Sequence, residues 1–123
     1  MVDGTVVDIV RGYLRVLPKY GVHATRGIIF GSFARGESTE WSDIDLIVVA
    51  REFDVPYGPS LLENLWCATG ETDNRIEPIP CGEREWETGD NRPIIEIARR
   101  EGVVVGKVLE MDGAPGRQEG KVQ

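Results

Sequence analysis

Three segments of the chain place hydrophobic residues at the three- and four-residue spacing of an amphipathic helix. Each segment also carries residues that favour a helix start or stop. The expected helices are residues 6–17 with Asp3 or Thr5 as cap and Gly21 as stop, residues 61–66 with Ser60 as N-cap, and residues 94–98 with Pro93 in the first turn and Gly102 as terminator.

Four shorter runs favour strands. RGIIFG (26–31) and DIDLIVVA (43–50) are continuously apolar apart from their ends, which is typical of strands buried on both faces. NRIEPIP (74–80) is expected to be extended, because a residue before proline avoids the helical region, and its prolines favour a sheet edge. VVV (103–105) adds a final strand. Strands interleaved with helices predict an α/β (α+β) fold.

The composition predicts one globular domain. The chain has 123 residues, of which 41% are hydrophobic and 28% charged, and this suffices for a single core. We expect the domain to cover residues 1–106. Residues 107–123 are rich in glycine and charge and offer little surface to bury, so we expect a flexible C-terminal tail.

The charge balance narrows the range of partners. Fourteen basic and 21 acidic residues give a net charge of -7, the wrong sign for a broad surface that binds long nucleic acids. Cys67 and Cys81 lack metal-site spacing, and the single histidine supports no zinc site. No signal segment and no apolar run of roughly 18 residues is present, which predicts a cytoplasmic protein without a membrane span.

Two acidic residues open the most apolar strand. Asp43 and Asp45 are two positions apart, so on a strand they share one face with about 6.6–6.8 Å between their Cα atoms. Two like charges held this close repel one another, and a hard divalent cation that prefers oxygen ligands relieves the repulsion. The pair therefore predicts a magnesium site.

The turn before this strand is suited to an anion. Gly31 allows close approach of the backbone to a ligand, Ser32 offers a hydroxyl and free amide groups, and Arg35 offers a charged contact to the same phosphate. Taken alone, Ser32 is better explained as a helix cap and the two aspartates as ordinary acids at a strand start, while Arg35 is equally a surface arginine. Their combination favours a nucleoside triphosphate bound with magnesium.

The stretch GSFARGESTEWSDIDL (31–46) resembles the Gly-Ser, ten residues, Asp-x-Asp signature of the DNA polymerase β-like nucleotidyltransferase superfamily. The short chain resembles the minimal nucleotidyltransferase branch. The resemblance implies a small mixed sheet flanked by helices, two magnesium ions that manganese can replace, and transfer of a nucleoside monophosphate from a triphosphate to a hydroxyl. It also implies that Gly31 and Ser32 hold the leaving pyrophosphate, while Asp43 and Asp45 bind metal.

The same family uses a third carboxylate on a neighbouring strand as metal ligand and general base. Glu77 in NRIEPIP is the candidate, although the family more often has aspartate there, and the extra methylene changes its reach. Asp73 is the reserve candidate, but its surroundings, ETDN, are typical of a turn.

Nothing in the sequence identifies the base or the acceptor. ATP is the expected donor because it is abundant. A chain this short leaves no room for an acceptor-binding domain, so the acceptor site is expected at a homodimer interface or on another protein. The minimal branch implies a small all-helical HEPN partner in a toxin–antitoxin pair. The competing hypothesis is a binding module that neutralises such a partner with little or no catalysis.

Overall fold

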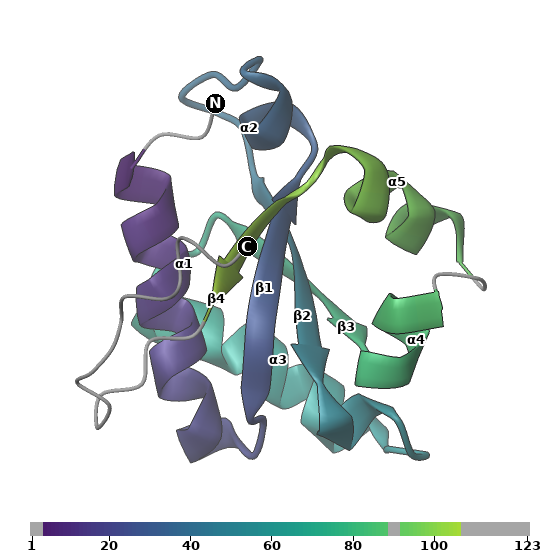
Figure 1. Cartoon of the computed structure of the whole chain (residues 1–123). Coiled ribbons are helices and arrows are strands. Elements are labelled where there is room, and N and C mark those ends of the chain that lie inside the picture. The colour runs from purple at the N-terminus through teal and green to yellow at the C-terminus, as the bar shows by residue number, and fades with distance from the viewer. Residues whose placement is uncertain (1–3, 89–91, 107–123) are drawn as a thin grey trace, which may run out of the picture.

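The computed structural model describes residues 4–88 and 92–106, which form a four-stranded sheet with helices on both faces (Figure 1). In chain order the elements are α1 (Gly4–Val16), η1 (Leu17–Tyr20), β1 (Ala24–Phe30), α2 (Ser32–Arg35), β2 (Ile44–Ala50), η2 (Arg51–Phe53), α3 (Pro59–Glu71), β3 (Ile76–Cys81), α4 (Glu83–Thr88), α5 (Pro93–Glu101) and β4 (Val103–Gly106). The expected fold class and the four expected strands are confirmed. The tail proposed for residues 107–123 lies outside the described residues.

The sheet is mixed and has the order β3-β2-β1-β4. β1 pairs antiparallel with both β2 and β4, whereas β2 and β3 run parallel. β3 is an edge strand, as its two prolines predict. Proline has no backbone N–H and cannot donate the hydrogen bonds that a central strand makes to its neighbours. The end where β1 stops and β2 begins carries α2, which stands at the top of Figure 1.

Each face of the sheet has its own core. The larger core joins α1 and α3 to inward-facing residues such as Leu46 and Val48 of β2. The smaller core joins α4 and α5 to the alternate residues, including Ile47 and Val49 of the same strand. This explains why β2 is continuously apolar from Leu46 to Ala50, since both of its faces are covered (Figure 1).

The helix boundaries differ in detail from those predicted. α1 ends at Val16 and continues as a 3-10 turn, because Pro18 disfavours the α conformation of the residue before it; the turn ends at Gly21, with φ 86°. Thr5 lies inside α1 and Asp3 lies outside the described residues. Ser60 is not an N-cap, because Gly58 holds that position and Pro59 begins α3.

The sequence pattern did not predict α4. The side chain of Asp54, from the turn after η2, accepts a hydrogen bond from the backbone N–H of Arg84 at 3.1 Å and so satisfies the first turn of this helix. Gly82 passes so close to Asp54 that an added Cβ would lie 2.1 Å from the carboxylate. The helix start therefore depends on a residue 30 positions earlier.

Within residues 4–88 and 92–106, no helix is long and apolar enough to cross a membrane.

Candidate active site

The candidate site lies where β1 turns into α2. Gly31 has φ 78° and ψ -149°, a region open essentially to glycine alone. A Cβ at this position would lie 2.2 Å from Oδ2 of Asp45. Glycine is thus required here for two reasons. It adopts the backbone angles of the turn, and it lets the carboxylate of Asp45 lie against the main chain.

The sheet register brings the acidic residues of two strands together. Asp45 of β2 is the direct partner of Glu77 of β3, and because the strands are parallel and in register, both residues lie on the same face. Asp43 precedes β2 by one residue and has the same parity as Asp45. The residue after Asp43 is already paired with the β3 side, since the N–H of Ile44 donates to the carbonyl of Arg75 at 2.8 Å. Asp43, Asp45 and Glu77 therefore share one end of the sheet, on the side of α5.

The carboxyl groups are close enough to disturb one another's ionisation. The pKa of Glu77 is raised, first by a hydrogen bond between its carboxyl group and Asp43, then by burial and by the charges of Asp43 and Asp45. The pKa of Asp45 is also raised, first by burial and then by Asp43, while Arg35 opposes the shift. Negative charge is concentrated here beyond what the protein's own cations neutralise.

These residues fit magnesium that is shared with a substrate. Within the described part of the chain, no three His, Cys, Asp or Glu side chains converge as a ready-made metal site. Magnesium, however, is usually held by one or two carboxylates together with substrate phosphates rather than by an all-protein cage. The carboxyl groups of Asp43, Asp45 and Glu77 lie together at one end of the sheet and satisfy that requirement.

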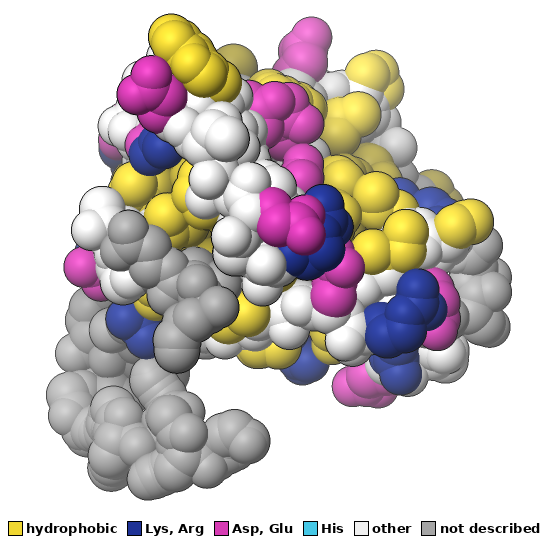
Figure 2. Space-filling view, turned by 90° about the horizontal axis from the view of Figure 1, so that it is seen from above, with side chains coloured by type: hydrophobic (Ala, Val, Ile, Leu, Met, Phe, Trp, Pro, Cys, Tyr) yellow, Lys and Arg dark blue, Asp and Glu magenta, His cyan; other side chains and the backbone are white. Residues whose placement is uncertain are grey.

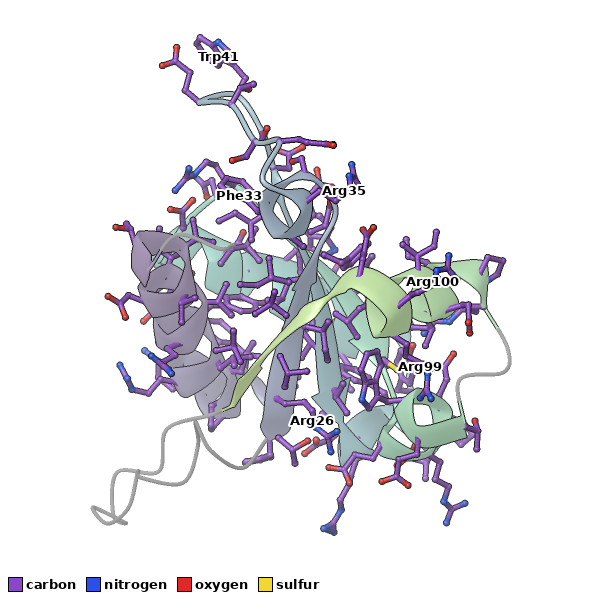
Figure 3. All side chains as sticks on the ribbon, turned by 45° about the horizontal axis from the view of Figure 1, so that its top comes forward. Arg26, Phe33, Arg35, Trp41, Arg99 and Arg100 are labelled. Carbon is purple, nitrogen blue, oxygen red and sulfur yellow. The ribbon has the colours of Figure 1, made fainter. Side chains whose placement is uncertain are left out.

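Ser32 and Arg35 lie on α2, and the charge of Arg35 acts on Asp45. The N-cap position of α2 belongs to Gly31, so Ser32 is the first helical residue and not a capping side chain. Phe33 and Arg35 extend to opposite sides of α2 (Figure 3), Phe33 into the larger core and Arg35 toward solvent. Arg35 donates from Nε to Glu37 at 2.9 Å and from Nη1 to Glu101 at 3.1 Å.

Glu101, the last residue of α5, is a site residue that the sequence did not indicate. Its Oε2 accepts hydrogen bonds from the backbone N–H of Gly31 at 3.0 Å and from Arg35 at 3.1 Å. The two partners precede it by 70 and 66 positions, and no motif links them. Figure 2 shows this end of the molecule from above, with acidic side chains gathered around its centre beside basic ones.

Comparison with known proteins identifies the family. The model of the nucleotidyltransferase domain family matches residues 13–104, most of the chain. The chain belongs to this nucleotidyltransferase family. The family resemblance predicted from the Gly-Ser and Asp-x-Asp residues is thereby confirmed.

Two individual proteins are similar to this nucleotidyltransferase. One, from Methanocaldococcus jannaschii, is named a "putative protein adenylyltransferase" and is 44% identical over 61 residues, which cover 49% of this chain and 56% of that protein's length. The other is a crystal structure of a "putative nucleotidyltransferase" from Sulfolobus solfataricus, with a TM-score of 0.56 and 18% identity over 84% of this chain and 86% of that one. At this identity the second likeness shows the fold alone.

Asp73, the reserve candidate for the third carboxylate, does not lie with the two aspartates. Asp73 lies in the turn before β3, where both of its oxygens accept hydrogen bonds from the guanidinium of Arg75 at 3.1 Å. These bonds lower the pKa of Asp73, and the carboxylate is committed to its own turn. Glu77, rather than Asp73, is the acid that lies with the two aspartates.

The loop between α2 and β2 presents an exposed aromatic side chain two positions before Asp43. Trp41 is 84% exposed and stands at the tip of this loop (Figure 3). The loop is held by hydrogen bonds from the N–H of Thr39 to Oγ of Ser42 at 2.8 Å and from the N–H of Trp41 to Oγ1 of Thr39 at 3.1 Å. Trp41 is therefore displayed by an ordered turn and takes no part in a core.

Proposed function

We propose that this nucleotidyltransferase transfers a nucleoside monophosphate, AMP from ATP, to a hydroxyl group on a partner protein with the help of two magnesium ions. The observation that carries the proposal is the in-register placement of Asp45 and Glu77 beside the Gly31 turn, with Asp43 close enough to raise the pKa of Glu77. The name of the Methanocaldococcus relative supports AMP as the group transferred and a protein as the acceptor.

In the proposed reaction the acceptor oxygen forms a bond to the α-phosphorus of the triphosphate, and the bond from that phosphorus to pyrophosphate breaks. Asp43, Asp45 and Glu77 would hold the magnesium ions, which neutralise developing charge on the phosphates and favour ionisation of the hydroxyl. Glu77 would accept the hydroxyl proton, a task that suits a carboxylate whose pKa is raised. The N–H of Gly31, Ser32 and Arg35 would hold the departing pyrophosphate.

The first prediction tests the metal and nucleotide site. Magnesium or manganese with ATP should raise the melting temperature of the wild type, because the ligand binds only the folded chain. Asp43→Asn combined with Asp45→Asn should leave the free protein at least as stable, since it removes repulsion, and should abolish the response to ligand. Differential scanning fluorimetry measures both effects.

The matched control removes the same charge elsewhere. Glu63 of α3 and Glu96 of α5 are exposed, and neither is among the groups that shift the pKa of Asp45 or of Glu77. Glu63→Gln combined with Glu96→Gln should respond to magnesium-ATP like the wild type. An equal response from the Asp43→Asn, Asp45→Asn protein would contradict the assignment of the site.

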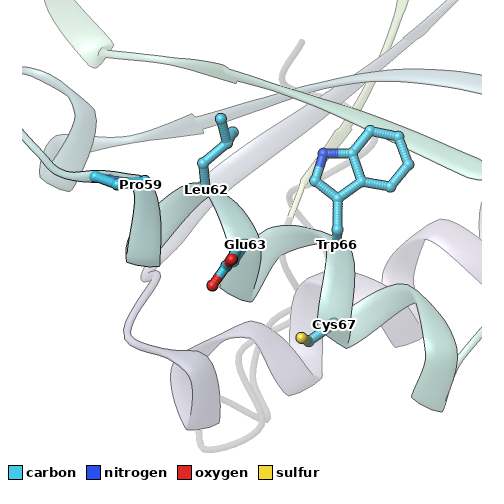
Figure 4. A pocket seen from close by; sticks show the side chains of 5 residues that line it. All are labelled: Pro59, Leu62, Glu63, Trp66 and Cys67. Atoms are coloured by element: carbon cyan, nitrogen blue, oxygen red, sulfur yellow. The ribbon is translucent and has the colours of Figure 1, made fainter.

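A second candidate function, a binding module that neutralises a helical HEPN-type partner, is favoured by one observation. The outer side of α3 carries a hollow lined by Pro59, Leu62, Glu63, Trp66 and Cys67 (Figure 4). Exposed apolar surface of this kind is typical of contacts with other proteins.

Mass spectrometry after mixing the chain with a helical partner separates the two functions. The enzyme hypothesis expects the partner to become heavier by one nucleoside monophosphate on a Ser, Thr or Tyr with the wild type, and to stay unmodified with Asp43→Asn, Asp45→Asn. A stable complex without added mass, at every triphosphate and metal tried, would favour the binding module. Efficient modification of a small-molecule hydroxyl by the isolated chain would contradict both.

A further inference from the structure

The carboxylate of Glu101 occupies the same donor groups that the proposed function assigns to phosphate. Its Oε2 accepts one hydrogen bond from the N–H of Gly31, at 3.0 Å, and one from Nη1 of Arg35, at 3.1 Å. A backbone N–H and a guanidinium that converge on a single oxygen are the donors by which proteins bind phosphate oxygens. Glu101 is thus an anion of the protein itself, bound to an anion site.

The fold fixes the backbone that carries this carboxylate. Gly102, directly after α5, has so little room that a Cβ would lie 2.3 Å from Cγ2 of Ile28 and 2.5 Å from the carbonyl oxygen of Ala98. Its N–H donates to that carbonyl at 2.8 Å and closes the last turn of the helix. Glu101 therefore starts from an anchored position against β1, and rotation of its side chain is the movement open to it.

The position of Glu101 is electrostatically unfavourable apart from these two hydrogen bonds. A negative charge at the C-terminal end of a helix opposes the helix dipole. Glu101 also adds to the negative field on Asp45 and contributes to the raised pKa of that group. Its side chain is only 27% exposed, so water screens this repulsion incompletely. The contacts with Gly31 and Arg35 offset these costs and hold the carboxylate in place.

We propose that Glu101 is an internal competitor of the nucleotide phosphates and sets the affinity of the site for them. This inference rests on the proposed function. A triphosphate with its magnesium must displace the carboxylate from Gly31 and Arg35 before its own oxygens take these donors. The displaced carboxylate turns toward solvent, and Glu101 thereby weakens the binding of every ligand that engages these two groups.

The alternative role for Glu101 is a positioning residue that holds Arg35 ready for phosphate. The two roles predict opposite signs. If Glu101 competes, neutralising it tightens phosphate binding, whereas if it positions Arg35, neutralising it weakens binding. Glu101→Gln is the suitable change, because glutamine keeps the size and one acceptor oxygen but loses the charge that strengthens the hydrogen bonds.

The experiment measures binding of magnesium-ATP, magnesium pyrophosphate and adenosine by isothermal titration calorimetry. For Glu101→Gln we expect magnesium-ATP and magnesium pyrophosphate to bind about tenfold more tightly, the size of effect that follows when one charge-assisted hydrogen bond becomes a neutral one. Adenosine, which has no phosphate, should bind equally to both proteins. Glu96→Gln removes the same charge from an exposed position of α5, where Glu96 pairs with Arg100 at 3.8 Å, and should bind like the wild type.

The backbone amide of Gly31 provides a readout that does not depend on affinity. In ¹⁵N-resolved NMR spectra its resonance should move when Glu101 is changed to Gln, and magnesium-ATP should move it in both proteins. Equal or weaker binding of magnesium-ATP by Glu101→Gln would overturn the competitor role and leave the proposed function standing. Failure of every protein, including Glu101→Gln, to bind magnesium-ATP would overturn both.

Discussion

At the scale of single residues, Gly31 is constrained both by its backbone angles and by its contact with Asp45. Gly31→Ala places a Cβ at φ 78° and within 2.2 Å of Asp45 Oδ2. We expect it to lower the free energy of unfolding by about 3 kcal/mol or more, since a residue forced into this backbone region costs about 1–3 kcal/mol before any clash. Nucleotide binding should be lost as well, because the backbone N–H must move. Urea denaturation and calorimetry measure the two effects.

Gly36 supplies the control for Gly31. It also has a positive φ, 74°, but lies in the left-handed helical region and has nothing within 4 Å of an added Cβ. Gly36→Ala should therefore cost about 1–2 kcal/mol from backbone strain alone and keep nucleotide binding. Equal losses from both substitutions would show that the contact with Asp45 does not matter.

The two cysteines differ sharply in their surroundings. Cys67 is exposed, while Cys81 is buried and has its pKa raised to about 12, first by burial and then by Glu85. Because the thiolate is the reactive form, Cys81 should be inert at pH 8. We expect iodoacetamide to label the native protein once, at Cys67, and the urea-unfolded protein twice, as read by mass spectrometry of peptides. Labelling of Cys81 in the native protein would contradict the placement of β3.

At the scale of elements, the sequence predicted the helices and strands whose signals lie within a few neighbouring residues. The helical spacing in α1, the apolar runs of β1 and β2, and the prolines of β3 each act over a few positions, and these elements were predicted. α4 was missed because its six residues, EREWET, have no apolar period, and its start depends on Asp54 from another turn. Strand order was not predictable either, because it is set by packing of α1, α3 and α5 against the sheet.

The residues of the candidate site also divide into those that local sequence could predict and those that it could not. Gly31, Ser32, Asp43 and Asp45 stand within a single motif, so their spacing in the sequence indicated a common site. Glu77 was a prediction from resemblance, and the register of β2 with β3 places it beside Asp45. Glu101 was not predictable, because only the packing of α5 on β1 brings its carboxylate to Gly31.

An ion pair links α4 to the start of α5. Arg92 donates from Nε and Nη2 to the two oxygens of Glu85 at 2.8 and 2.9 Å, and from Nη2 to the carbonyl of Pro80 at 2.7 Å. The hydrogen bonds from Arg92 lower the pKa of Glu85 in the folded protein. A carboxyl group with a lowered folded-state pKa stabilises the fold above its unfolded pKa of about 4.3 and loses this contribution as pH falls through the folded value.

Glu85→Gln should therefore be pH-dependent in its effect. At pH 7 we expect it to reduce the free energy of unfolding by about 1 kcal/mol, a modest figure because the pair is partly exposed and screened by water. Below pH 4 the wild type and the variant should converge. Urea denaturation at pH 7, 5 and 3.5 measures this, with Glu63→Gln as an exposed control. A difference that is independent of pH would contradict the role of this ion pair.

At the scale of the whole molecule, negative charge is both in excess and unevenly distributed. Acidic residues outnumber basic ones by seven, as 21 against 14. Four of the acids, Asp43, Asp45, Glu77 and Glu101, lie at one end of the sheet, where Arg35 is the cation that opposes the shift of Asp45. Repulsion between these acids lowers the stability of the ligand-free protein, and binding of the proposed magnesium-nucleotide complex would remove the repulsion.

Salt should therefore stabilise the ligand-free protein. Raising sodium chloride from about 10 mM to about 150 mM shortens the screening length from about 30 Å to about 8 Å, which weakens repulsion between the acids. Screening also weakens exposed ion pairs such as Lys19 with Glu71, but such pairs contribute little at any salt concentration. We expect the melting temperature of the wild type to rise with salt.

Asp45→Asn tests whether the end of the sheet is the source of this effect. Asp45 is partly buried and lies close to Asp43 and Glu101, so its removal eliminates the repulsion that water screens least. The variant should melt higher than the wild type at about 10 mM salt, where screening is weakest, and gain less from added salt. Glu63→Gln removes the same charge from the exposed side of α3 and should keep nearly the whole salt response of the wild type. Equal salt responses in all three proteins, measured by differential scanning fluorimetry without metal or nucleotide, would place the repulsion in the overall charge of -7 rather than in the carboxylates of the site.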